Sequence, residues 1–184
     1  MLPAFNYIQP KSVKEAVSAL KGEATHVLAG GSDLLGCLRD EVLEADKLVS
    51  LSALSSELQG ISKIPEGGIS IGALTSISEV AESKLIKDKY PGLAQAASEV
   101  ASPQLRNQGT IGGNLCQKPR CWYYRGDFHC LRKGGQLCFA LGGEDAFHCI
   151  LGGQNCFIVH PSDTAPMLAA LEAKVHIFGP EGER

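Results

Sequence analysis

The chain has 184 residues, of which 44% are hydrophobic and 20% are charged, and its formal net charge is -3. This length and composition allow one compact domain or two small ones, which excludes a disordered tail. The slightly acidic balance argues against a nucleic-acid binder, which normally carries a basic face.

No basic segment followed by a long apolar stretch opens the chain. We therefore predict neither a signal peptide nor a membrane span, and we expect a cytoplasmic protein.

The first predicted element is a helix from Ser12 to about Lys21. Ser12 and Glu15 have the spacing of a capping box, and Gly22 can end the helix in the left-handed conformation. The apolar positions 13, 16, 17 and 20 fall on one face, which we expect to pack on the core.

A glycine turn follows, between a short strand at 26–29 and a helix that begins near Leu34. Gly30 and Gly31 let a backbone approach a ligand closely, and amide groups at a helix N-terminus bind phosphate oxygens. The turn is therefore a candidate phosphate site, although an ordinary turn has the same pattern.

The next elements are a strand at 47–51 and a hairpin around 66–68 with its second strand at 69–73. Ser76 and Glu79 then form a second capping box at a helix start. The order of strand, glycine, hydroxyl residue and helix start thus recurs, and a helix at 91–101 follows.

A third glycine-rich segment, residues 102–115, holds Gly109, Gly112 and Gly113 among amide, hydroxyl and guanidinium side chains. Such a backbone is suited to wrap a polyanionic ligand at close range. Beyond the cysteines we predict a strand at 156–160, a helix at 163–173 with Ser162 as N-cap and Met167, Leu168 and Leu171 facing inward, and a strand at 174–178.

Cysteines occur seven times, at positions 37, 116, 121, 130, 138, 149 and 156. An odd, clustered set in an intracellular chain indicates a metal site more than a disulfide framework. A zinc site with His129 or His148 stays open beside an iron–sulfur cluster, but the paired CxxC spacing of zinc ribbons is missing. Bases between Lys118 and Lys133 form either a solvated loop or a counter-charge for a bound anion.

Five segments in this order resemble the FAD subunit of the xanthine dehydrogenase family: 5–16, 29–34, 71–75, 106–114 and 160–163. The resemblance implies an α+β fold of the vanillyl-alcohol-oxidase type with FAD extended between two subdomains. It places subdomain 1 at 1–55 and subdomain 2 at 56–184, the latter cut short and holding an iron–sulfur insertion at about 116–156.

The resemblance also implies which residues bind FAD, through the first glycine turn, the loop before the second capping box, the third glycine segment and one acid for the ribityl hydroxyls. These residues are Ala29, Gly30, Gly31, Ser32, Asp33, Leu34, Thr75, Arg106, Asn107, Gly109, Thr110, Gly112, Gly113, Asn114 and Asp163.

The insertion resembles the flavin subunits of 4-hydroxybenzoyl-CoA reductase and of a bacterial aldehyde oxidoreductase, which carry an extra [4Fe–4S] cluster. On that resemblance the four ligands are Cys121, Cys130, Cys138 and Cys156. Cys149 and Cys116 fall outside the set, and we expect Cys37 to be a buried small hydrophobe.

The implied function is electron transfer between FAD, iron–sulfur clusters and NAD or ferredoxin, in a hetero-oligomer with a large molybdopterin-binding subunit and a small [2Fe–2S] subunit. No side chains here form a catalytic triad, which suits a subunit whose chemistry belongs to cofactors. The alternative is a non-catalytic, zinc-bound scaffold that keeps the flavin fold without FAD.

Overall fold

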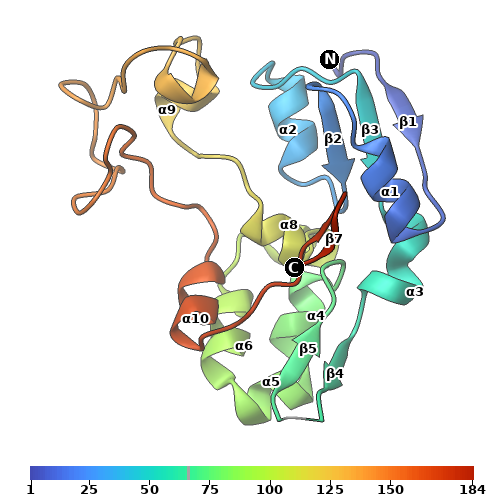
Figure 1. Cartoon of the computed structure of the whole chain (residues 1–184). Coiled ribbons are helices and arrows are strands. Elements are labelled where there is room, and N and C mark those ends of the chain that lie inside the picture. Colours follow the sequence, from blue (N-terminus) through green and yellow to red (C-terminus); the bar gives the residue numbers. More distant parts are fainter. Residues whose placement is uncertain (66) are drawn as a thin grey trace.

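The computed structural model describes residues 1–65 and 67–184 (Figure 1). A small sheet with its helices and a second, mainly helical part with a hairpin pack together. A third segment, which carries α9 and most of the cysteines, extends away from both as an irregular lobe (Figure 1).

The first part is a parallel sheet with a helix on each face. Its strands are β1 (Asn6–Ile8), β3 (Lys47–Ser50) and β2 (Thr25–Leu28), in that spatial order, and its helices are α1 (Val13–Ala19) and α2 (Leu34–Arg39). Successive side chains of a strand point to opposite faces. Val49 accordingly packs with Ala16 of α1, while its neighbour Leu48 packs with Leu38 of α2.

The second part surrounds the largest core, and short helices supply most of it. η1 (Ser52–Leu54) and α3 (Ser55–Leu58) lead into it from the sheet, and their Leu54 and Leu58 still pack in the core of the first part. Its own elements are β4 (Ile61–Lys63), β5 (Ile69–Ile71), α4 (Ile77–Glu82), α5 (Lys84–Lys89), α6 (Pro91–Ser98), α7 (Pro103–Gln108) and α8 (Ile111–Leu115). Ile77, Val80, Ile86 and Leu93 meet in its centre, and each is at most 2% exposed.

The C-terminal third has little regular structure. Its elements are α9 (Trp122–Arg125), η2 (Leu131–Lys133), α10 (Ala165–Ala170), β6 (Phe178–Gly179) and β7 (Gly182–Glu183). Helix α10 packs on α6 through Met167 and Leu168, which anchors this end of the chain to the second part.

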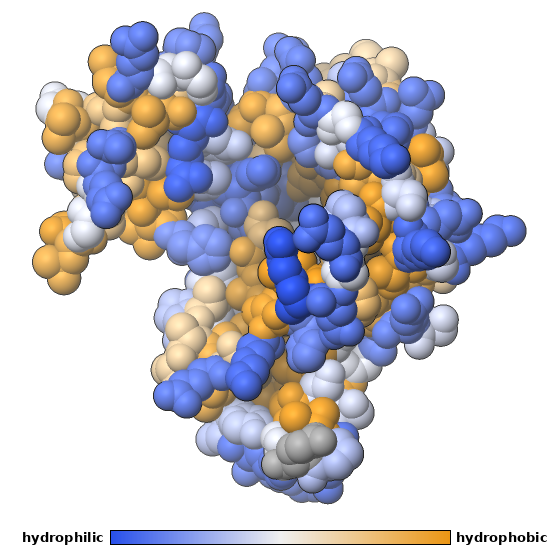
Figure 2. Space-filling view, viewed as in Figure 1, coloured by the Kyte–Doolittle hydropathy of each residue, from blue (hydrophilic) through white to orange (hydrophobic). Residues whose placement is uncertain are grey.

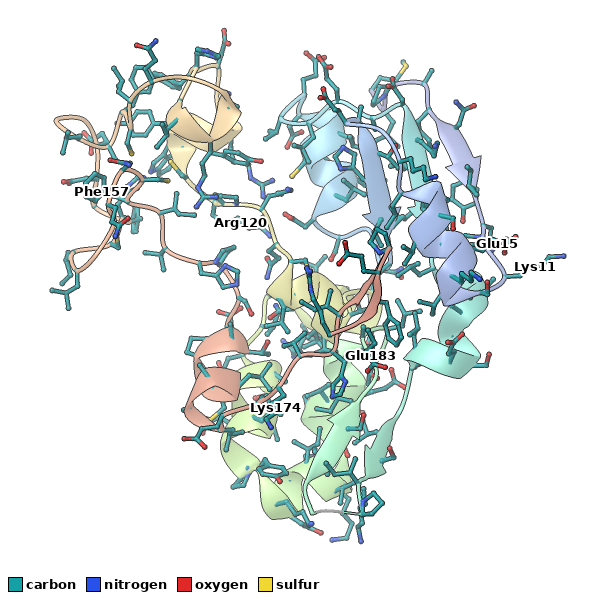
Figure 3. All side chains as sticks on the ribbon, viewed as in Figure 1. Lys11, Glu15, Arg120, Phe157, Lys174 and Glu183 are labelled. Carbon is teal, nitrogen blue, oxygen red and sulfur yellow. The ribbon has the colours of Figure 1, made fainter. Side chains whose placement is uncertain are left out.

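The structure confirms most predicted elements at slightly different bounds. Helix α1 ends at Ala19, earlier than predicted, and its capping box is only half formed, because Glu15 accepts from the backbone N–H of Lys11 (Figure 3). The predicted hairpin is β4–β5, paired antiparallel. Glu66 in its turn lies outside the described residues.

Two predicted strands near the C-terminus are wrong. Residues 156–160 form no strand, and of 174–178 only Phe178 is in one. The predicted helix is confirmed over the shorter span of α10, with Met167 and Leu168 facing inward, whereas Leu171, just after the helix, is 40% exposed. An apolar run becomes a strand only where a neighbour accepts its hydrogen bonds, and among the described residues no strand lies beside 156–160.

The surface of the irregular lobe carries apolar patches between hydrophilic residues (Figure 2). Its exposed large side chains include Trp122, Leu141, Phe147, Ile150 and Leu151. In the part of the chain that the structure describes, no helix combines the length and the apolar character needed to cross a membrane.

Candidate functional site

The first and third glycine segments touch each other through backbone. A Cβ added at Gly30 would lie 1.9 Å from the carbonyl oxygen of Gln108, a distance that no side chain tolerates. Ser32 lies across from Gly109 in the same contact. Gly30 lies in the turn that leads into α2, and Gln108 is the last residue of α7. The contact between these two residues joins the two predicted ligand loops into one continuous surface.

The first glycine turn leaves a row of backbone amides free. Within residues 1–65 and 67–184, no acceptor faces the N–H groups of Gly30, Gly31, Ser32 or Asp33. Gly31 adopts a φ of 73°, a conformation that favours glycine. Unpaired amides at the start of a helix are able to bind anions such as phosphate, and the phosphate site at this turn stays a prediction.

The third glycine segment uses its amides differently. Ile111 N–H donates to Thr75 O at 2.9 Å and Gly112 N–H donates to Ala73 O at 3.0 Å. A Cβ at Gly112 would lie 2.9 Å from that same Ala73 oxygen. The glycines here let two loops pack closely, so any contact of this segment with a ligand comes from surfaces other than these amides.

Two predicted side chains, one on this segment and one on the loop that it contacts, serve the fold. Thr75 is fully buried, and its hydroxyl bonds the backbone N–H and C=O of Gly60 at 2.9 and 3.1 Å. Thr110 caps α8 by accepting from Gly113 N–H at 3.1 Å. Both residues shape the loops beside the glycine turn.

Arg106 and Asn107 lie in another cavity, of about 510 Å³, between α4, α6 and α7. Arg106 donates to Val100 O at 2.9 Å, and Asn107 accepts from the Ser78 hydroxyl at 2.6 Å. None of the other predicted FAD residues lines this cavity. The structure therefore separates these two side chains from the glycine contact.

Asn114 ties the third glycine segment to the segment around Asp163. Its Oδ1 accepts from the hydroxyls of Ser162 at 2.6 Å and Thr164 at 2.7 Å, and all three side chains are buried. Asp163 between them is exposed, so its carboxylate is available to a ligand. This hydrogen-bonded cluster was not predicted from the sequence. The hydroxyl residues on both sides of Asp163 are the sequence feature that could have indicated it.

Asp33 ties the first glycine turn to the cysteine-bearing lobe. Its carboxylate accepts from Arg125 Nη2 and from the backbone N–H of Lys118, each at 2.8 Å. Arg120, on the link between α8 and α9, lies 3.4 Å from the same carboxylate (Figure 3). Burial by itself lowers the pKa of Arg125, but the hydrogen bond to Asp33 raises it overall, so the guanidinium stays protonated.

The four cysteines predicted as cluster ligands line one small cavity in the irregular lobe. Cys121, Cys130, Cys138 and Cys156 share it with Tyr123, Tyr124, Leu131, Arg132, Phe139 and Ile158, and Cys149 is not among its lining residues. Across the described residues, no three His, Cys, Asp or Glu side chains stand close enough to hold a single metal ion. The lobe thus gathers the four thiols around one space without bringing them into direct contact.

Two of these four sulfur atoms face a nitrogen donor. His148 Nε2 lies 3.1 Å from Cys121 Sγ, and Arg132 Nε lies 3.2 Å from Cys156 Sγ. Both contacts have the geometry of N–H···S hydrogen bonds. The sequence named His148 only as a possible zinc ligand and Arg132 only as one of the bases between Lys118 and Lys133, so it did not predict these contacts with sulfur.

The remaining cysteines lie elsewhere. Cys37 is fully buried in α2, and burial raises the pKa of its thiol, which suits the predicted hydrophobic role. Cys116 is exposed at the end of α8, and Cys149 packs beside Gly153 and Phe157.

A family model described as the FAD binding domain in molybdopterin dehydrogenase matches residues 3–184. The FAD-binding subunit of an aldehyde oxidoreductase from Escherichia coli K12 is 33% identical over 186 residues, which cover 99% of this chain and 58% of that subunit. The carbon monoxide dehydrogenase medium chain of Hydrogenophaga pseudoflava is 39% identical over 116 residues, which cover 61% of this chain and 39% of that one.

Solved structures agree with these matches. Carbon monoxide dehydrogenase from Hydrogenophaga pseudoflava and quinoline 2-oxidoreductase from Pseudomonas putida 86 each align with a TM-score of 0.58, at 37% and 32% identity. Each alignment covers 62% of this chain and 40% of the other. The likeness confirms the predicted α+β fold, and the chain spans roughly half the length of the relatives that it matches.

Proposed function

This chain belongs to the family of FAD-binding domains of molybdopterin dehydrogenases, and from that premise we propose that it is the flavin electron-transfer part of a molybdopterin-dependent oxidoreductase complex. When bound, FAD supplies the exchange between one-electron and two-electron carriers. The chain supplies the binding surface and the route to the next carrier.

The observation that carries the proposal is the row of free amides at the first glycine turn. We assign the FAD pyrophosphate to the N–H groups of Gly30, Gly31, Ser32 and Asp33, which have no acceptor among the described residues. The exposed Asp163 carboxylate is assigned to hydroxyls of the ribityl chain. Asn114 holds the segment of Asp163 against the glycine loops.

The other predicted FAD residues are proposed to act around this row. Ala29 and Leu34 flank the glycine turn, while Thr75, Gly109, Thr110, Gly112 and Gly113 set the shape of the neighbouring loops. Arg106 and Asn107 are the weakest assignments, because their side chains line a different cavity. We also propose a subdomain boundary near residue 55, because no buried residue belongs to hydrophobic cores on both sides of it.

We further propose that the lobe holds a [4Fe–4S] cluster on Cys121, Cys130, Cys138 and Cys156. The four thiols line one cavity together with apolar side chains, and the Arg132 guanidinium lies beside one sulfur; these residue types support an anionic cluster that needs four thiolates. The relative from Escherichia coli matches 99% of this chain, whereas the carbon monoxide dehydrogenase chain matches 61%. This difference in coverage supports the proposal that the cysteine-bearing lobe is a segment that only some relatives share.

The proposed partners are a large molybdopterin-binding subunit and a small [2Fe–2S] subunit, with NAD or ferredoxin as external carrier. The exposed apolar side chains of the lobe support a hetero-oligomer, because large exposed apolar patches mark protein contacts. All seven cysteines are free thiols, which supports a reducing compartment such as the cytoplasm.

Cofactor analysis of the complete complex, purified with its partners, tests the proposal. We expect one FAD per copy of this chain, and we expect Gly30→Ala to remove it while Gly36→Ala keeps it. A complex without FAD in this chain overturns the flavin assignment and favours the scaffold alternative.

Iron and acid-labile sulfide separate the cluster from zinc. We expect Cys121→Ser, Cys130→Ser, Cys138→Ser and Cys156→Ser each to lower iron by about four atoms per copy of the chain, as one [4Fe–4S] cluster requires. Cys116→Ser and Cys149→Ser are the controls and should keep the full iron content. Stoichiometric zinc without extra sulfide contradicts the cluster.

A further inference from the structure

His148 is a buried histidine whose ring is held against a proposed cluster ligand. Its side chain is 9% exposed, and its Nε2 lies 3.1 Å from Cys121 Sγ. The ring also lies beside Tyr123, with ring centroids 6.2 Å apart. In an irregular lobe, a buried polar side chain at this distance from a thiol points to a specific contact.

The other ring nitrogen identifies the tautomer. Nδ1 of His148 is buried, and it is the one buried side-chain nitrogen or oxygen atom that finds no hydrogen-bond partner among the described residues. A buried N–H without an acceptor costs more than a bare lone pair, so the proton belongs on Nε2. Nε2–H then donates to the sulfur of Cys121.

This tautomer argues against His148 as a metal ligand through Nε2, the nitrogen that faces Cys121. A ligating histidine binds the metal through one nitrogen and normally donates the other N–H to a carbonyl or carboxylate. No such acceptor faces Nδ1 within the described chain. The ring is therefore placed to support a thiolate ligand.

A second donor faces another of the four sulfurs. Arg132 lies in η2 and directs Nε toward Cys156 Sγ at 3.2 Å, although the two residues are 24 positions apart. A guanidinium is always protonated, so this contact is an N–H···S hydrogen bond from a positively charged donor.

We propose that His148 and Arg132 are positioning residues that raise the reduction potential of the cluster through N–H···S bonds to Cys121 and Cys156. The inference rests on the cluster proposed above. Reduction adds one electron, and the extra negative charge spreads onto the sulfur atoms. Donors already aimed at those atoms stabilise the reduced state more than the oxidised one, and hydrogen bonds to sulfur set cluster potentials.

A potentiometric titration of the intact complex, followed by electron paramagnetic resonance, tests the proposal without using turnover. We expect His148→Phe and Arg132→Leu each to favour the oxidised cluster about tenfold, a drop of about 59 mV for a one-electron couple. His148→Gln keeps an amide donor and should stay nearer to the wild type. His129→Phe is the matched control, because His129 is exposed and donates to no sulfur among the described residues.

The outcomes separate this inference from the proposed function. A wild-type chain without the cluster signal overturns the cluster itself, before any variant is compared. A normal cluster whose potential is unchanged in both His148→Phe and Arg132→Leu overturns the hydrogen-bond role alone. Loss of iron from both His148→Phe and His148→Gln identifies His148 as a ligand, which also overturns its role as a donor.

Discussion

Arg125 Nη2 donates to Asp33 Oδ1 at 2.8 Å across 92 positions of sequence. This bond fastens the cysteine-bearing lobe to the first glycine turn, so the two proposed cofactor sites share one connection. The same guanidinium donates through Nε to Pro119 O at 2.8 Å, which braces the link that leads into the lobe.

Replacing Arg125 should loosen the lobe. Both side chains of the pair are largely buried, at 21% and 15% exposure, and a hydrogen bond between charged groups contributes about 1.5–3 kcal/mol. We expect Arg125→Met to lower the free energy of unfolding by that amount, measured in urea. The control is Arg39→Met, whose pair with Asp40 is exposed to solvent and should contribute little to stability. Equal losses in both variants contradict a special role for Arg125.

Gly30 and Gly36 should respond oppositely to alanine. At Gly30 the new Cβ meets the Gln108 carbonyl, so we expect the loops to separate, FAD affinity to fall and stability to drop by about 1–3 kcal/mol. At Gly36, inside α2, no atom lies within 4 Å of the new Cβ, so alanine should stabilise by about 0.5–1 kcal/mol. Thermal unfolding and flavin fluorescence measure both effects. A Gly30→Ala chain that binds FAD normally is incompatible with the loop contact.

Removing the amide of Asn114 should release the segment that carries Asp163. Asn114→Ala leaves two buried hydroxyls, those of Ser162 and Thr164, without their shared acceptor, and each unsatisfied group costs about 1–3 kcal/mol. We expect faster amide hydrogen exchange at residues 162–170 and weaker FAD binding. Asn155→Ala, at an exposed position, should change neither quantity.

The capping box of α4 predicts a loss of stability in acid. Burial raises the pKa of Glu79, but hydrogen bonds from Ser76 and Gln59 outweigh it and hold the pKa below the usual 4.5. A carboxylate with a lowered folded-state pKa stabilises the fold fully above the unfolded value, and this contribution disappears as pH falls through the folded value.

Glu79→Gln should therefore flatten the dependence of the urea midpoint on pH below about 4.5, the usual pKa of this side chain. Glu57→Gln in α3 is the control, because Glu57 is exposed and accepts no hydrogen bond among the described residues. Identical acid profiles for wild type and Glu79→Gln would rule out this contribution.

Local chemistry made much of this fold readable in the sequence. The capping box at Ser76, the glycine turn at Gly30 and the alternation along β3 act over a few residues, so their outcome depends little on distant chain. Helices α7 and α8 were missed although Ser102 and Thr110 cap them. The glycines in and beside these helices were interpreted as part of a ligand-binding loop, whereas in the fold they allow two backbone segments to pack closely.

The sequence by itself determined the motifs, the α+β class and the set of thiols, because residue types and short spacings already limit the backbone and the chemistry. Only the tertiary structure decided that Gly30 meets Gln108, that Asp33 pairs with Arg125 and that His148 reaches Cys121. Each of these contacts joins residues far apart in sequence. Such pairs form when the chain packs, and no local pattern in the sequence records them.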